Sequence, residues 1–151
     1  MELEPFIAQG AARGILVRWK TGAELYPGQQ AAAVVYGPNL RRMAGDAGQR
    51  LMVAYTRALR DYYDAFGPRH RGRAEIVAIL TENTPLKDAA LYDQMGATYF
   101  NPDCYLNVDA MQWDLDWYAS NGFVTQKPDL PATIDNSYCD YAIQQLGRYQ
   151  P

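Results

Sequence analysis

The sequence has no long apolar run. None of its stretches approaches the roughly 20 consecutive apolar residues that a membrane-spanning helix needs, so we expect no stable membrane insertion. The start of the chain, residues 1–6, also lacks the basic and apolar segments of a secretory signal. Taken alone, this start favours a cytoplasmic protein, unless the native N-terminus lies further upstream.

The chain also lacks an excess of basic residues, and histidine is scarce. The formal net charge is -3 and His70 is the only histidine. An acidic balance argues against a general nucleic-acid partner, which would favour a basic face. A single histidine gives little material for a histidine metal site or a Ser-His-Asp triad. We therefore expect no metal, no cofactor and no nucleic acid.

Cysteine is limited to Cys104 and Cys139. Two cysteines this far apart do not make a structural zinc site, which uses four ligands with close pairs. In an exported protein they can form one disulfide, but the sequence does not give their distance. Two unpaired thiols in packed surroundings are the favoured interpretation, because free cysteine is usually buried.

What is present is typical of a globular domain. Hydrophobic residues make up 48% of the 151 residues and charged residues 21%, which is enough for a core. The pattern predicts two short strands, Ile15–Trp19 and Ala31–Tyr36, the second stopped by Gly37-Pro38. The rest of the chain is predicted to be mainly helical, with helices over about 4–14, 45–66, 74–80, 85–93, 107–121 and 136–146. Gly67-Pro68 and Gly147 are expected to end helices, and Asn107 is expected to cap one. Spacings of three and four predict one packed face on the longest helix, made of Leu51, Tyr55, Ala58, Leu59, Tyr62 and Phe66. The expected fold class is α/β, and because two strands are not a stable sheet, we expect a part of a larger structure.

Short motifs along nearly the whole chain support a family resemblance. The C-terminal motifs are Asp114-Leu115-Asp116-Trp117-Tyr118, Asn121-Gly122-Phe123-Val124, Ile134-Asp135-Asn136-Ser137-Tyr138 and Leu146-Gly147. The upstream motifs include Glu4-Pro5-Phe6, Val17-Arg18-Trp19, Tyr26-Pro27, Gln29-Gln30 and Val34-Val35-Tyr36-Gly37-Pro38. In their order and spacing they resemble the periplasmic binding proteins for nitrate, sulfonates, taurine and the pyrimidine precursor of thiamine.

The resemblance implies the C-terminal portion of a type II periplasmic-binding-protein fold, without the family's N-terminal half. Residues 1–30 would be a remnant of the second lobe, 31–38 a hinge strand and 39–151 the C-terminal helices of the first lobe. The implied function is the extracytoplasmic, or periplasmic, solute-binding component of an ABC importer. Such a protein closes on a small organic molecule or anion and presents it to the membrane permease, without catalysis.

The resemblance also points to ligand-binding residues. Glu4, Pro5 and Phe6 match a motif at a helix start beside the ligand, where free N–H groups favour anions. The alternative is an ordinary N-terminal helix with a solvated carboxylate. Tyr36 ends the expected hinge strand and could direct its hydroxyl to the cleft, although packing of its ring is the favoured interpretation.

Two other functions stay open. One is an enzyme of thiamine-pyrimidine biosynthesis on the same fold. The other is a small helical interaction module that docks to another protein, which would explain strands without neighbours. Trp113 and Trp117, four residues apart, could form an aromatic shelf for such a partner, although an ordinary half-exposed helix face is favoured.

Overall fold

The structure is a computed structural model that describes residues 3–42, 46–96 and 98–150. Within these ranges the chain forms helices and no strand. The helices are α1 (Phe6–Ala12), α2 (Gly22–Leu25), α3 (Pro38–Arg42), α4 (Ala47–Phe66), α5 (Arg73–Asn83), α6 (Leu91–Gln94), α7 (Val108–Ser120), α8 (Leu130–Thr133) and α9 (Ser137–Leu146).

The predicted α/β fold class is therefore wrong. Ile15–Trp19 and Ala31–Tyr36 are neither helix nor strand, and the hinge strand expected at residues 31–38 is coil that runs into α3. The physical reason is the lack of a pairing partner. The backbone of residues 16–20 and 31–36 makes no hydrogen bond to the backbone of another described residue. A strand is stable only in a ladder with a neighbour, however favourable its own composition.

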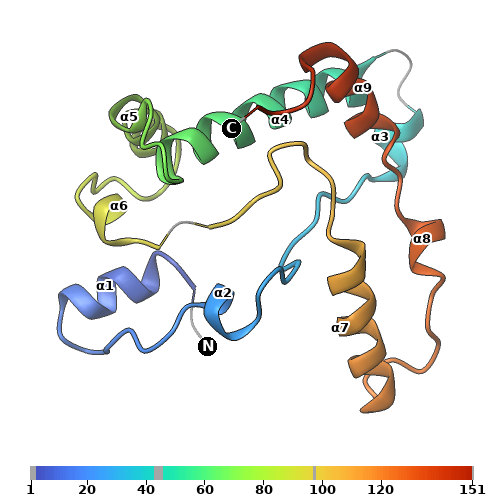
Figure 1. Cartoon of the computed structure of the whole chain (residues 1–151), viewed down its shortest axis with the longest axis horizontal. Helices are drawn as coiled ribbons and strands as arrows, with labels where there is room; N and C mark the ends of the chain where they lie inside the picture. Colours follow the sequence, from blue (N-terminus) through green and yellow to red (C-terminus); the bar gives the residue numbers. More distant parts are fainter. Residues whose placement is uncertain (1–2, 43–45, 97, 151) are drawn as a thin grey trace.

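The longest helix, α4, forms the main packing unit together with α9. Figure 1 shows α9 lying along the N-terminal half of α4. Their interface is built around buried Met52, Cys139 and Ala142. Gly48 contributes by having no side chain, because the Tyr138 ring occupies the space that a Cβ at this position would need. The close approach of the two helices thus depends on small residues facing large ones.

A second cluster lies at the other end of α4. Ala65, Phe66 and Tyr92 are buried there, between α4, α5 and α6. Arg73 connects the three helices, because its guanidinium lies 4.5 Å from the centre of the Phe66 ring and donates a 2.7 Å hydrogen bond to the Tyr92 carbonyl. This cation–π contact and hydrogen bond orient α5 and α6 at the helix end.

Several helix ends follow the signals in the sequence. Asn107 precedes α7 and its side chain accepts a hydrogen bond from the Ala110 N–H, which is the N-cap that the sequence predicts. Gly147 ends α9 with a positive φ of 72°, a conformation that favours glycine. In the described parts of the chain, no helix combines the length and apolarity needed to cross a membrane.

The helices lie around the periphery of an open arrangement (Figure 1). The α4–α9 pair and α5 form one side, α1 and α2 lie opposite, and α7 and α8 form a third side. The segment 98–106 passes between these groups. Residues 98–106 are therefore positioned by their contacts with α4. The candidate site depends on this position.

Candidate functional site

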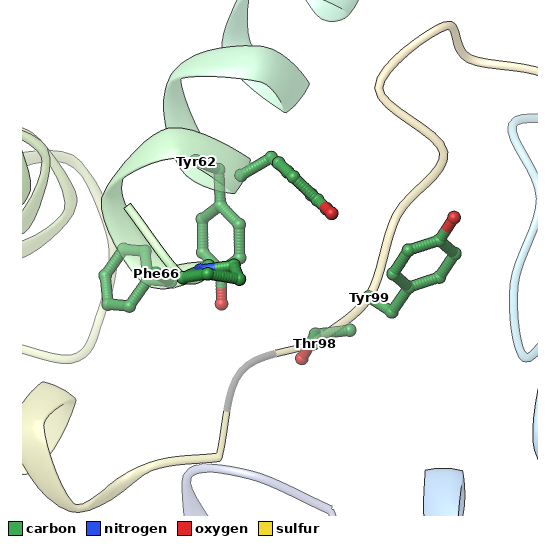
Figure 2. A pocket seen from close by; sticks show the side chains of 7 residues that line it. Tyr62, Phe66, Thr98 and Tyr99 are labelled. Carbon is green, nitrogen blue, oxygen red and sulfur yellow. The ribbon is translucent and has the colours of Figure 1, made fainter. Parts of the chain in front are cut away.

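The C-terminal end of α4 and the segment after α6 form a half-open pocket lined mainly by aromatic rings. It has a volume of about 170 Å³. Its lining residues are Tyr62, Tyr63, Phe66, Gly67, Pro68, Thr98 and Tyr99. Figure 2 shows Tyr62 and Phe66 at the end of the helix on one side, and Thr98 and Tyr99 from the connecting segment on the other. The pocket thus lies between two segments, residues 62–68 and 98–99, that are far apart in the sequence.

The helix side of the pocket is fixed by packing. The Tyr62 and Phe66 rings stack with their centres 4.4 Å apart, which is an ordinary offset geometry for aromatic pairs. Phe66 is also part of the buried cluster with Tyr92. The helix ends here because Pro68 cannot continue it, and the Gly67 N–H bonds the Tyr63 carbonyl at 2.9 Å. This wall is therefore preformed.

The opposite side is more exposed. The Tyr99 side chain is 71% exposed and meets the Tyr63 ring edge-on, with the centres 6.2 Å apart. Such a ring can adjust its rotamer at little cost, because few contacts hold it. The pocket therefore combines a fixed aromatic wall with an adjustable one.

Charged groups lie behind the pocket rather than in it. The Tyr63 ring contacts the Tyr149 ring, with the centres 5.5 Å apart. The Tyr149 hydroxyl donates a hydrogen bond to Asp64, which Arg69 also contacts at 3.3 Å. Burial, followed by the hydrogen bond and negative charge of Asp64, raises the pKa of Tyr149. Tyr149 therefore stays protonated at neutral pH and serves as a hydrogen-bond donor.

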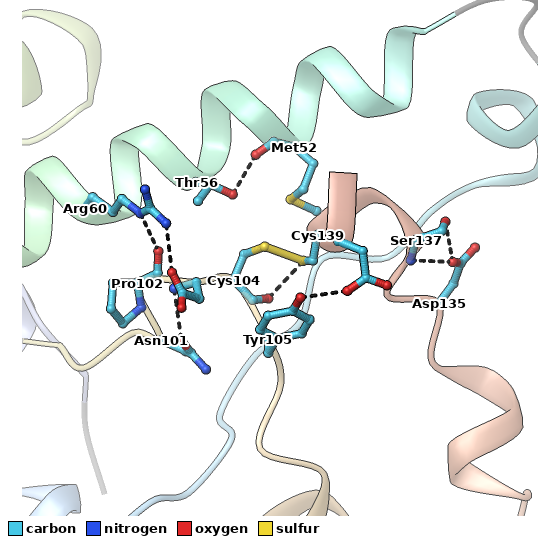
Figure 3. The surroundings of a disulfide bond; sticks show 12 residues. Met52, Thr56, Arg60, Asn101, Pro102, Cys104, Tyr105, Asp135, Ser137 and Cys139 are labelled. Carbon is cyan, nitrogen blue, oxygen red and sulfur yellow. Dashed lines mark hydrogen bonds and ion pairs between the residues drawn. A yellow bond between two sulfur atoms is a disulfide. The ribbon is translucent and has the colours of Figure 1, made fainter. Parts of the chain in front are cut away.

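The connecting segment is held against α4 by one arginine. Arg60 donates a hydrogen bond to the Pro102 carbonyl at 3.1 Å (Figure 3). It donates another to the Asp103 carboxylate at 2.8 Å. The same guanidinium reaches the Gly147 carbonyl at 2.7 Å, beyond the end of α9. One side chain thus joins α4, the segment that carries Tyr99, and the C-terminal end of the chain.

Asp103 completes this junction. Its carboxylate accepts hydrogen bonds from Arg60, from Arg148 at 3.2 Å and from the Tyr149 N–H at 2.9 Å. Burial would raise the pKa of Asp103, but these hydrogen bonds and the charge of Arg60 outweigh it, so the pKa lies below the usual aspartate range. The Arg60–Asp103 ion pair is therefore structural, because three donors within the chain already occupy the Asp103 carboxylate.

A disulfide lies next to this junction. Cys104 and Cys139 are joined, with their Cα atoms 6.0 Å apart (Figure 3). Two unpaired thiols, the interpretation favoured from the sequence, are therefore wrong for this structure. The bond links the connecting segment to α9, and so fixes the residue after Asp103 to the α4–α9 unit.

The predicted site residues do not come together in one cleft. The Glu4 carboxylate is largely buried and accepts hydrogen bonds from Ala8 N–H at 3.1 Å, Arg18 at 2.6 Å and Gly96 N–H at 3.1 Å. It is neither solvated nor free for a ligand. It joins α1 and the following coil to the segment after α6. Pro5 immediately precedes α1, and Phe6 is 60% exposed.

Tyr36 belongs to a different environment. Its ring packs edge-on against Tyr138, with the centres 5.0 Å apart, beside the α4–α9 interface. Burial, with smaller effects from Asp135 and neighbouring tyrosines, raises the pKa of Tyr36. Tyr36 is thus a packing residue that stays protonated, and it lines neither the aromatic pocket nor the surroundings of Glu4.

Sequence reasoning missed the pocket itself. Tyr62 and Phe66 were expected only as a packed helix face, and Thr98 and Tyr99 were not singled out. The available signal was the concentration of aromatic residues around the Gly67-Pro68 helix end. The sequence contains no indication that residues 98 and 99 would lie opposite that end, because the contact depends on the Arg60 junction.

Metal chemistry finds no support in the parts of the chain that the structure describes, where no group of three or more histidine, cysteine or acidic side chains could hold an ion. The pocket itself offers aromatic faces and hydroxyl groups, which suit binding.

Comparisons with protein-family models, with curated proteins and with solved structures found no match to the chain.

Proposed function

We propose that the chain is part of an extracytoplasmic solute-binding protein that supplies a small organic molecule to an ABC importer. The proposal combines the family resemblance of the motifs along the sequence with the aromatic pocket. It no longer draws on a hinge strand, because residues 31–38 do not form one. The function proposed is capture and delivery to a membrane permease, without a chemical step on the ligand.

The pocket carries the proposal because its size and lining suit one kind of ligand. Apolar cavities of about 150 Å³ hold a molecule the size of benzene, and this pocket has about 170 Å³. Its described lining residues include three tyrosines and one phenylalanine, and none is charged. Of the ligands that the resemblance suggests, a pyrimidine fits this lining better than nitrate or a small sulfonate. An inorganic anion would favour positively charged or N–H donors.

The disulfide supports the proposed location. Structural disulfides persist mainly in oxidising compartments such as the periplasm or the extracellular space. The Cys104–Cys139 bond is consistent with such a compartment. The proposed partner in the membrane is the permease of the importer, which would receive the ligand from the bound state.

The test is a thermal-shift panel of uncharged single-ring pyrimidines, compared with nitrate and taurine. A ligand that binds only the folded state raises the apparent Tm. We expect a ring compound to raise Tm, and Tyr99→Ala to abolish the shift, because this exposed ring contributes one wall of the pocket.

The matched control is Tyr55→Ala, which removes an exposed tyrosine from the same helix outside the pocket. It should retain the ligand-induced shift. A panel in which nitrate or taurine alone raises Tm, or in which Tyr55→Ala and Tyr99→Ala lose the shift equally, would refute the pocket as the site.

A second candidate, the interaction module, is favoured by a different observation. Large apolar side chains along the non-helical segments are exposed, among them Val17, Trp19 and Val35. Apolar groups exposed in a row usually mark a contact surface. This function does not exclude solute binding, since the two surfaces involve different residues.

A further inference from the structure

The hydroxyl groups of the aromatic pocket are not used by the fold. The lining residues that carry a hydroxyl are Tyr62, Tyr63, Thr98 and Tyr99. In the part of the chain that the structure describes, none of these hydroxyls hydrogen-bonds another residue. Two tyrosines outside the pocket show the contrast, since Tyr149 donates to Asp64 and Tyr105 donates to Asp140. The pocket therefore contains hydrogen-bonding groups that are available to a ligand.

The Tyr62 hydroxyl is accessible from the pocket. Among the described residues that are not exposed, every buried side-chain oxygen or nitrogen has a hydrogen-bond partner. Tyr62 is half-buried and its hydroxyl has no partner, so the hydroxyl must be the part of the side chain that stays accessible. Figure 2 shows the Tyr62 ring extending from the end of α4, with its hydroxyl on the side where Thr98 lies. A ligand between the two segments can therefore meet this hydroxyl directly.

Packing fixes the direction of the Tyr62 hydroxyl. The Tyr62 ring stacks on Phe66 with an interplanar angle of 23°, and Phe66 is only 9% exposed. Phe100 of the connecting segment meets the same ring edge-on, with the centres 5.4 Å apart. Contacts from both sides thus hold Tyr62, whereas the Tyr99 ring is 71% exposed. A group held in one direction by its neighbours can discriminate between ligands.

We infer that the Tyr62 hydroxyl is the specificity-determining group of the pocket. It selects rings that carry a hydrogen-bonding atom at the edge, such as uncharged pyrimidines, over hydrocarbon rings of the same size. This inference rests on the proposed function, because it assigns a role within the same site.

The physical reason is the exchange of one hydrogen bond for another. An accessible hydroxyl bonds water when no ligand is present. A pyrimidine nitrogen that displaces this water accepts a hydrogen bond from the Tyr62 hydroxyl in its place. Benzene displaces the water without replacing the bond, which lowers its affinity. The aromatic walls can stack on either ring, so they do not make this distinction.

The test combines two probes with one substitution. Pyrimidine and benzene have nearly the same shape, but only pyrimidine has ring nitrogens. Tyr62→Phe keeps the aromatic wall and removes only a hydroxyl that no other described residue binds. The dissociation constants of both probes are measured by NMR titration of the unmodified chain and of the variant. Taking the ratio of the two constants cancels the difference in hydration between the probes, as in a double-mutant cycle.

We expect Tyr62→Phe to weaken the binding of pyrimidine by about 3- to 10-fold, which corresponds to one hydrogen bond between neutral groups. Benzene should bind the variant at least as tightly as it binds the unmodified chain. Tyr55→Phe is the matched control, because Tyr55 is an exposed tyrosine of the same helix that does not line the pocket. It should leave both dissociation constants unchanged.

The outcomes separate this inference from the proposed function. If both rings bind and Tyr62→Phe leaves the ratio of their dissociation constants unchanged, or if only benzene binds, the inference is wrong while capture of a ring in the pocket stands. An equal change of the ratio in Tyr55→Phe would also overturn it. So would a large loss of Tm in ligand-free Tyr62→Phe, because the fold would then use the hydroxyl. If neither ring shows saturable binding, the proposed function fails and the inference fails with it.

Discussion

Loss of the Cys104–Cys139 disulfide should strongly destabilise the chain. The perturbation is the double variant Cys104→Ala/Cys139→Ala, which removes the bond without relying on reductant to reach a buried sulfur; Cys139 is only 4% exposed. The two cysteines are 35 residues apart. In the chain-entropy treatment, opening a loop of this length removes about 4 kcal/mol of stabilisation.

This value is large compared with the roughly 5–15 kcal/mol that stabilises an ordinary domain. The loop that would open contains α7 and α8, which have few other anchors. One of them is the Tyr26 ring against Trp113, with the centres 5.0 Å apart. Another is the Asn107 side chain on the Gly28 carbonyl at 2.7 Å. Loss of the disulfide should therefore affect the whole segment between the two cysteines.

The assay is urea unfolding followed by far-UV circular dichroism. The unmodified chain should unfold at a higher urea concentration than the double variant, and addition of reductant should lower only the midpoint of the unmodified chain. Loop closure predicts that the free energy of unfolding of the unmodified chain exceeds that of the double variant by roughly 4 kcal/mol. A difference of less than about 1 kcal/mol would refute the reasoning. A reductant effect on the double variant would show that the reagent acts elsewhere.

Three further predictions concern the helix core and the junction behind the pocket. Met52→Ala should lower the free energy of unfolding by about 2–4 kcal/mol, because Met52 is 3% exposed between α4 and α9. Leu51→Ala should lower it by less than about 1 kcal/mol, because Leu51 is 49% exposed. The urea midpoints of the two variants measure the difference. Arg60→Met should make residues 98–103 more accessible to protease, because it removes the hydrogen bonds to Pro102 and Asp103; an unchanged cleavage pattern would contradict this role. Because the pKa of Asp103 is lowered in the folded state, its carboxylate stabilises the chain above the ordinary aspartate pKa near about 4, and this stabilisation is lost as pH falls through the lowered value. Asp103→Asn should therefore be less stable than the unmodified chain near neutral pH, with a difference that shrinks in acid; a constant difference between about pH 3 and pH 7 would show that the charge does not matter.

The sequence predicted the longer helices α1, α4, α5, α7 and α9, but not the short helices α2, α3 and α8. It also predicted a helix over 85–93, where the structure has only α6, Leu91–Gln94. Local signals determine a helix: the Asn107 cap, the Gly67-Pro68 stop and the Gly147 end all act within a few residues, and all three lie where expected. Strands depend on neighbours far along the chain. Ile15–Trp19 has the composition of a strand but no described partner, so composition alone gave the wrong class.

The buried face of α4 was predicted only in part. Leu51 and Tyr55 were expected on the packed face, but Met52 and Thr56 are buried instead, so the face is turned by about one residue. Thr56 was not among the residues expected on the packed face. Its hydroxyl donates a 2.8 Å hydrogen bond to the Met52 carbonyl within the helix, which removes the cost of burying it.

The candidate site was the least predictable part. The resemblance pointed to Glu4, but the Arg18 and Gly96 contacts that satisfy its carboxylate depend on how two distant segments fold together. The same is true of the pocket. Tyr99 lies opposite the end of α4 because Arg60 binds Pro102 and Asp103 in the segment that carries Tyr99. Long-range contacts of this kind have no local sequence signal.

The most direct test of the proposed solute binding is chemical-shift mapping by NMR. The chain would be titrated with the ring compound that gives the largest thermal shift. The account predicts that the perturbed resonances belong to the residues that line the pocket, which are Tyr62, Tyr63, Phe66, Gly67, Pro68, Thr98 and Tyr99. Perturbations confined to the surroundings of Glu4 and Phe6, or no saturable change with any ring compound, would contradict it.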